Sequence, residues 1–283
     1  MAGWDEEFDV EKERADQLTM LTDLKPKERP GEFVSTVVDD RDHTMFGGSV
    51  LGQAITAITR DAPEGRRLHS LHGYFLRPTS PQMPIDYVVS TIRDGRAYSS
   101  RRIHASQRGK ATFEAMGSFT TDTEGGWLYD LPHASALPPR PEPDGFGMAG
   151  LEAAFLGATE QRGDGTYEST ERKWFRMPPA FTDAIGDDIH LHTAYFGMVS
   201  DWTGMGSRPL KMNWDDDFEA GNGPPVASLD HAVWFHRPAR ITDWHLMDMH
   251  SLVNFGGRGQ VRMTIRNEAG EVVLSMAQEL LLR

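Results

Sequence analysis

Two stretches of this chain share an order of residues that constrains the fold more than any other feature. Residues 72–78 read HGYFLRP and residues 231–238 read HAVWFHRP. At similar intervals each is followed by a Gly-Arg pair, at 95–96 and 257–258, and then by a hairpin turn, QRGK or NEAGE. Finally EAMGSF lies against LSMAQE, which sets Met116 against Met276 and Ser118 against Gln278. Four landmarks in the same order predict a tandem repeat of one structural unit.

Hydrophobic periodicity indicates what that unit contains. Apolar residues of the first copy fall at helical spacing and predict a helix from about 47 to 60: Val50, Leu51, Ala54, Ile55 and Ile58. Three strand-like segments separated by turns follow it. The second copy repeats this order, with Asp187 and Asp188 suited to the N-terminus of its helix. The prediction is an α+β fold in which each repeat wraps an antiparallel sheet around one long helix.

Composition excludes several classes of protein. The formal net charge of −13 argues against nucleic acid or anionic lipid as the main partner. The chain has no cysteine, which excludes disulfides, thiolate zinc sites and cysteine nucleophiles. The acidic N-terminus is unlike a secretory signal, and no apolar run approaches the roughly 20 residues that span a bilayer. We therefore expect a cytoplasmic protein without membrane insertion.

The segment between the two copies has a different character. It is rich in proline and ends in GFGMAG at 145–150, which matches the dinucleotide-binding pattern G-x-G-x-x-G. That pattern needs a strand before it, whereas a proline run precedes it here, so we interpret it as linker. The predicted organisation is an N-terminal arm over 1–30, a first repeat over 31–122, a connecting segment over 123–180 and a second repeat over 181–283.

These motifs also carry a family resemblance. The stretches FGGSVLGQA, HSLHGYFLRP, RDGRAYSSRRI, LDHAVWFHRP and the closing MAQE resemble those of the acyl-CoA thioesterase II family. The resemblance covers almost the whole chain, from about residue 30 onward. It implies a double hot-dog fold with one continuous sheet, and hydrolysis of acyl-CoA to a fatty acid and CoA without a cofactor.

The resemblance also implies three catalytic residues in the second repeat. Family members hold a water with an aspartate, a threonine or serine, and a glutamine. The matching positions are Asp201 in GMVSD, Ser228 in ASLDH and Gln278 in MAQE. By rough alignment the first repeat offers only Thr56, Ser70 or a neighbour, and Ser118, so the chemistry is expected once.

Each of these residues also has a plainer interpretation. Asp201 could be a solvated or capping residue near a helix end, Gln278 an ordinary solvent-facing strand residue, and Ser228 a turn serine. As a base, Asp201 needs burial to raise its pKa from the ordinary value near ~3.9. Gln278 cannot act as a base, but its amide both donates and accepts, which orients a water.

Histidines near this triad suggest other chemistries. Strand alternation predicts that Ser228 and Asp230 share one face and that His231 takes the other, which argues against a Ser–His relay. His72 is a candidate for substrate contact, against the plainer interpretation of a histidine satisfied in the core or an interface. The two histidines of IHLHT have the wrong helical spacing for a shared metal, so no metal is expected.

The remaining substrate contacts are assigned on chemical grounds. The Gly47-Gly48 turn that opens the first helix is a candidate for backbone N–H donors to the thioester oxyanion. Arginines are expected at the phosphates of CoA, with Arg96 and Arg258 as the main candidates, beside Arg101 and Arg262.

Two rival functions stay open beside acyl-CoA hydrolysis. One is a hot-dog acyl-CoA hydratase or dehydratase, which would need a paired histidine and carboxylate. The other is a non-catalytic acyl-CoA-binding protein that keeps the fold. The sequence leaves open whether the chain forms a homo-oligomer, as a dimer or a tetramer.

Overall fold

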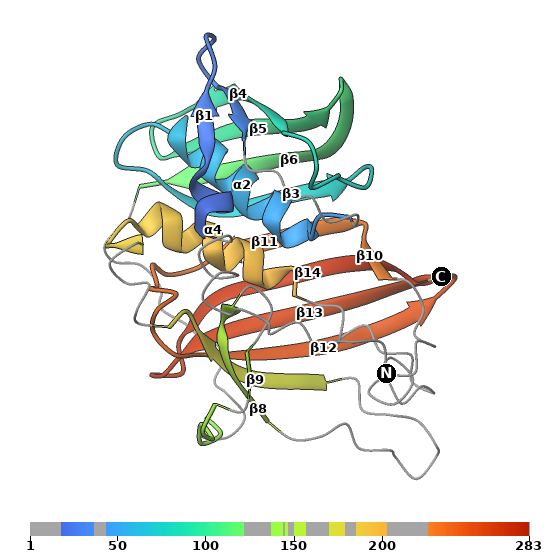
Figure 1. Ribbon diagram of the computed structural model, residues 1–283. Coiled ribbons are helices and arrows are strands. Elements are labelled where there is room, and N and C mark those ends of the chain that lie inside the picture. The colour runs from blue at the N-terminus through green and yellow to red at the C-terminus, as the bar shows by residue number, and fades with distance from the viewer. Residues whose placement is uncertain are drawn as a thin grey trace.

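The structure of the chain is a computed structural model that describes residues 18–36, 44–121, 137–143, 145–146, 150–156, 170–178, 185–202 and 226–282. Most of the predicted N-terminal arm, part of GFGMAG and the loop before residue 226 lie outside these residues. Within them, a 14-stranded antiparallel sheet curves around helices α2 (Gly47–Arg60) and α4 (Ile189–Ser200), which lie on the same side of it (Figure 1).

The strand order of the sheet reflects the predicted repeat. The first half runs from the edge inward as β1 (Leu24–Pro26), β2 (Glu32–Ser35), β4 (Asp86–Asp94), β5 (Tyr98–Gln107), β6 (Lys110–Thr120) and β3 (Arg67–Phe75). The second half continues outward as β11 (Asp230–Phe235), β14 (Val272–Leu282), β13 (Arg258–Asn267), β12 (His245–Phe255), β9 (Thr170–Arg176), β8 (Glu152–Phe155) and β7 (Gly145–Phe146). The short strand β10 (Val226–Ser228) also pairs with β14.

The two stretches that revealed the repeat lie side by side at the centre of this sheet. Strands β3 and β11 pair antiparallel, with Leu71 opposite Val233 and His72 opposite Ala232. Because this pairing joins the two halves, their sheets form one surface and bury both helices against a shared core. This is the arrangement expected for a double hot-dog fold.

Both predicted helices are present. Helix α2 spans 47–60 as predicted and is buried from Gly48 to Thr59, while Asp188 caps the N-terminus of α4 by accepting from the backbone N–H groups of His190 and Leu191. The helices approach closely where glycines lie between them. A Cβ on Gly52 would meet Cβ of Met198 at 3.3 Å, so a larger side chain would push the helices apart.

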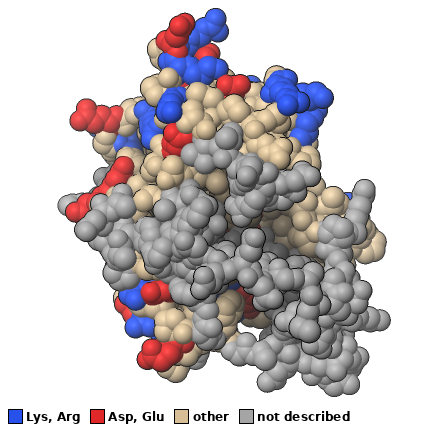
Figure 2. Space-filling model, viewed as in Figure 1, with Lys and Arg blue, Asp and Glu red and all other residues tan. Residues whose placement is uncertain are grey.

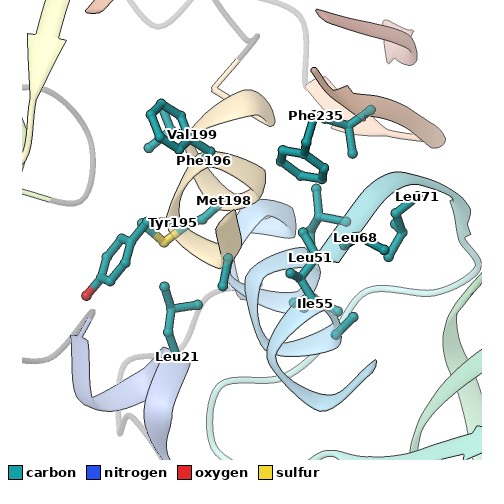
Figure 3. Close-up of a cluster of buried hydrophobic side chains, with 14 of the residues drawn as sticks. Leu21, Leu51, Ile55, Leu68, Leu71, Tyr195, Phe196, Met198, Val199 and Phe235 are labelled. Carbon is teal, nitrogen blue, oxygen red and sulfur yellow. The ribbon is translucent and has the colours of Figure 1, made fainter. Parts of the chain in front are cut away.

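The core joins both repeats. Side chains of α2, α4, β3 and β11 meet in one cluster, in which Leu51, Ile55, Leu68 and Phe235 are labelled in Figure 3. Among the described residues on the face in Figure 2, basic and acidic side chains lie close together over the first repeat. Among all the residues that the structure describes, no helix is long and apolar enough to cross a membrane.

The structure differs from the sequence prediction between the repeats. Strands β7, β8 and β9 fall within 123–180, which the sequence predicts as a connecting segment, and β9 is hydrogen bonded to β12. The reason is the polar beginning of β9, which reads TERKWFR. Lys173 is fully buried in it because its ammonium pairs with Glu171 at 2.7 Å and stacks on the ring of Trp202. The charged residues at the start of β9 are therefore the reason why the sequence does not predict this strand, which extends the second sheet.

Candidate active site

The two helices pack against each other near the seam of the sheet, with the start of α2 beside the end of α4. The N-terminus of α2 faces the C-terminus of α4, where Asp201 is the residue that ends the helix. Its carboxylate is only 1% exposed. A solvated position, the plainer interpretation of Asp201, does not fit this burial. A buried ionisable group needs partners, because removing a charge from water is costly.

Partners come from two strands that are distant from Asp201 in the sequence. The hydroxyl of Ser228 on β10 donates to Oδ1 of Asp201 at 2.9 Å, and Nε2 of Gln278 on β14 donates to the same oxygen. Ser228 lies opposite Leu280, so β10 places it next to Gln278 on the inner side of the sheet. The structure thus brings the three predicted residues together around one carboxylate oxygen.

The environment of Asp201 changes its acidity. Burial raises the pKa of Asp201 to about 7, against the opposing effect of hydrogen bonds from Gln278, Ser228 and the backbone N–H of Gly48. A carboxylate with this pKa is a much stronger base at neutral pH than an exposed aspartate, and half of it is ionised there. The arrangement therefore suits proton abstraction near pH 7.

Two glycines make room for this carboxylate. A Cβ on Gly47 would lie 2.6 Å from Oδ2 of Asp201 and 3.2 Å from the ring of Phe75. A Cβ on Gly48 would collide with the carbonyl oxygen of Met198 and the ring of Phe46. The first turn of α2 can approach Asp201 only because neither position carries a side chain. Both predicted glycines thus lie at the site, and Gly48 contacts the carboxylate itself.

The prediction that Ser228 and His231 point to opposite faces of the sheet is wrong. Ser228 opposes Leu280 and Ala232 opposes Ala277, so one extra residue lies on this strand between the two pairs. Such a bulge at Leu229 shifts the alternation by one position. Asp230 instead accepts from the backbone N–H of Glu279, and His231 turns inward beside Ser228.

His231 is a residue of this site that sequence reasoning missed. It is 1% exposed, and its Nδ1 lies 3.7 Å from Oδ1 of Asp201 while its Nε2 is 2.8 Å from the hydroxyl of Ser200. A Ser–His relay is still not formed, because Ser228 donates to Asp201. The inward direction of His231 depends on the bulge at Leu229, and the residue types around Leu229 do not predict a bulge.

Other candidates are spread over the molecule. His72 lies on the outer face of the sheet, where its ring contacts that of Trp234 edge-on at 4.8 Å, away from Asp201. Arg96 is in the turn between β4 and β5, at the end of α2 opposite Asp201. Arg258 begins β13 opposite Leu281, at the same end of the sheet as Ser228, and its guanidinium pairs with Glu279 at 2.9 Å. Of these three, only Arg258 is near the candidate site.

Comparison with known proteins agrees with this geometry. The chain is 29% identical over 259 residues to acyl-CoA thioesterase 2 of Haemophilus influenzae, which covers 84% of this chain and 87% of that protein. A crystal structure of an acyl-CoA thioesterase II from Mycobacterium marinum has 29% sequence identity and a TM-score of 0.73, with coverage of 94% of this chain and 96% of that one.

More distant similarity shows the fold alone. A conserved protein with a hot-dog fold from Alicyclobacillus acidocaldarius has 15% identity and a TM-score of 0.70, covering 94% of this chain and 97% of that one. The predicted double hot-dog fold is therefore confirmed. Family models describe residues 38–120 as an acyl-CoA thioesterase N-terminal domain and residues 132–282 as an acyl-CoA thioesterase C-terminal domain. The chain belongs to the acyl-CoA thioesterase family, whose members are thioester hydrolases.

Proposed function

We propose that this acyl-CoA thioesterase cleaves its substrate by direct attack of a water that Asp201 activates and that Ser228 and Gln278 orient. The observation that carries the proposal is the convergence of two donors from separate strands on one oxygen of a buried carboxylate. A carboxylate with only a structural role is stabilised better by a salt bridge or by full solvation. Asp201 has instead a pKa that burial raises to about 7, which suits a base.

The hydrogen-bonding capacity of the three groups supports water binding. The hydroxyl of Ser228 carries acceptor lone pairs, and the amide of Gln278 carries an oxygen acceptor besides the N–H that it donates. A water can therefore give one proton to Asp201 and a hydrogen bond to either neighbour. Both lone pairs of the water oxygen then stay available, and one of them faces the thioester carbon, which is the orientation that attack requires.

The reaction proceeds in balanced steps. The water oxygen bonds to the carbonyl carbon while its proton passes to Asp201, and the carbonyl oxygen becomes an oxyanion. When the tetrahedral intermediate collapses, the carbon–sulfur bond breaks and the electron pair leaves with sulfur. Asp201 returns the proton to the thiolate, giving CoA with a free thiol and a carboxylic acid. No covalent enzyme intermediate is needed.

The first turn of α2 is the candidate donor to the oxyanion. N–H groups in the first turn of a helix have no acceptor within the helix and lie at the positive end of its dipole. The N–H of Gly48 already serves Asp201, so Gly47 is the nearer candidate for the carbonyl oxygen. For the phosphates of CoA, Arg258 is the candidate that lies at this end of the sheet.

One observation bears on the hydratase alternative. A histidine and a carboxylate do lie close together, with Nδ1 of His231 3.7 Å from Asp201. However, Nε2 of His231 is bonded to Ser200 and its Nδ1 faces Asp201, so both ring nitrogens are directed at protein groups. Hydration of enoyl-CoA, followed by loss of ultraviolet absorbance, tests this alternative with the same preparation.

The deciding experiment is release of free thiol from a panel of acyl-CoA chain lengths. We expect Asp201→Asn to lower the rate by about 10²-fold or more, as loss of a general base does. Asp230→Asn is the matched control, because that neighbouring carboxylate points away from Asp201 and its role as an acceptor survives in asparagine. Absence of thiol release by the wild type at every chain length would refute the thioesterase activity. An undiminished rate in Asp201→Asn would refute the role of Asp201.

A further inference from the structure

His231 is a fully buried imidazole whose two ring nitrogens have different surroundings. Its Nε2 lies 2.8 Å from the hydroxyl oxygen of Ser200 on α4. Its Nδ1 is buried, has no hydrogen-bond partner among the residues that the structure describes, and lies 3.7 Å from Oδ1 of Asp201. Burial lowers the pKa of His231 to about 3, so the ring is neutral and carries one proton. The position of that proton decides whether Nδ1 presents an N–H group or a lone pair to the carboxylate of Asp201.

The hydroxyl of Ser200 determines the position. It donates its single proton to the backbone carbonyl of Gly197 at 2.7 Å. Toward His231 it is therefore an acceptor, and Nε2 of the ring must be the donor. Nδ1 is then left with a lone pair.

The end of the helix explains why Ser200 keeps this orientation. In a regular helix the carbonyl of Gly197 would accept from the N–H of Asp201, four residues on. Here that N–H bonds to the carbonyl of Met198 at 3.3 Å, as the last turn tightens. The hydroxyl of Ser200 supplies a donor to the Gly197 carbonyl. Turning the Ser200 hydroxyl toward His231 would remove this hydrogen bond. The N–H then at Nδ1 would lie 3.7 Å from Oδ1 of Asp201, too far for a hydrogen bond unless the ring moves, so the bond count favours the proton on Nε2.

We propose that His231 is a positioning residue for the general base, fixed by Ser200 as the Nε2–H tautomer so that the bare lone pair of Nδ1 faces the carboxylate of Asp201. The role rests on the proposed function of Asp201 as the base. Because a bare Nδ1 cannot donate a hydrogen bond, the carboxylate gains no donor from the ring, and the lone pair disfavours its negative charge. It also favours the protonated carboxyl that forms when Asp201 takes the proton of the water.

Among the described residues, few charged or titratable groups act on this pair. The elements around Asp201 contribute the neutral donors Ser228, Gln278 and Gly48. His72, from the outer face of β3, lowers the pKa of His231 further. The buried ammonium of Lys173 on β9 stacks on Trp202, the residue after Asp201, and is paired with Glu171. The tautomer of His231 is therefore a feature of this pair that a substitution can change.

The tautomer can be observed directly in the wild-type protein. The ¹⁵N chemical shifts of ring nitrogens separate protonated from bare nitrogen, and the signals of His231 are those missing from His231→Leu. We expect a protonated Nε2 and a bare Nδ1. A protonated Nδ1 would overturn the proposal, and this measurement requires neither substrate nor activity.

The variant Ser200→Ala tests the consequence. Without the serine acceptor, the ring is free to place its proton on Nδ1 and donate toward Asp201. We expect the ¹³C titration of the Asp201 carboxyl to move to lower pH by about one unit, since an added donor stabilises the anion. The acid limb of kcat should move in the same direction, and the plateau of kcat should fall about threefold or more because a weaker base abstracts the proton more slowly.

A matched control separates this effect from general damage. Ser275→Ala removes the hydroxyl bonded to His236 at 2.8 Å, an equivalent Ser–His pair on the exposed side of the sheet, and should leave the Asp201 titration and the pH profile unchanged. A loss of activity in Ser200→Ala that is equal at every pH, with an unmoved carboxyl titration, would refute the proposal. If the wild type releases no thiol at all, the proposed function fails, while the ring and carboxyl titrations still decide the inference.

Discussion

Replacing Asp201 with asparagine removes a negative charge that the fold buries, and the structure predicts that the variant is more stable than the wild type at alkaline pH. The carboxylate is 1% exposed, and burial is the largest cause of its raised pKa. The hydrogen bonds from Ser228 and Gln278 offset only part of the cost of desolvation. Asparagine presents an oxygen of similar shape without the charge.

The magnitude follows from the pKa of Asp201 in the two states. It rises from an ordinary 3.8 in the unfolded chain to about 7 in the folded protein. Between these values the folded state binds more protons, so the stability of the wild type falls as pH rises. Roughly three units at 1.36 kcal/mol each give about 4 kcal/mol lost by pH 8. Well below pH 3.8 Asp201 is neutral in both states and contributes no such loss.

Urea unfolding of both proteins at several pH values between 4 and 8 measures this effect. The difference in unfolding free energy between Asp201→Asn and the wild type should increase with pH and level off above about 7. Other titrations, including that of His231, are present in both proteins and cancel to a first approximation. Asp230→Asn should show a smaller change, since that carboxylate is less buried. A difference that is constant with pH, or that shrinks as pH rises, would refute the account of Asp201.

Two further substitutions test the site. Gln278→Ala should lower thiol release by about 10²-fold, and it should move the acid limb of the rate to higher pH, because the bond from Gln278 lowers the pKa of Asp201; an acid limb that moves to lower pH would contradict this. Gly47→Ala should abolish most activity, since the new Cβ would lie 2.6 Å from Oδ2 of Asp201. A fully active variant whose crystal structure shows the Asp201 carboxylate undisplaced would contradict this.

Much of the site could be predicted, because its residues occupy positions in long motifs. Asp201, Ser228 and Gln278 each match a position in a family pattern, and the structure places all three together. His231 could not be found in this way. Its inward direction depends on a bulge at Leu229, and alternation read from letters assumes that no residue is inserted.

The same limit applies to the comparison between repeats. The rough alignment set Met116 against Met276 and Ser118 against Gln278. In the structure Met116 is 53% exposed and Met276 is 2% exposed, so that register is off by one position. Ser118 faces outward and bonds to His69 at 2.8 Å. A shift of one residue reverses the face of every side chain, and the hairpin turns of the two repeats differ in length.

By itself the sequence determined the local elements and their repeated order. Helix 47–60, the aspartate that caps the second helix and the hairpin turns follow from periodicity, capping and turn residues, which act over a few positions. Only the tertiary structure decided how the halves join and how acidic Asp201 is. Pairing of β3 with β11 links residues some 160 positions apart in sequence, as Leu71 opposite Val233 shows. The pKa of Asp201 arises from burial by both helices and the sheet, and desolvation is a property of the assembled core that no short stretch of sequence contains.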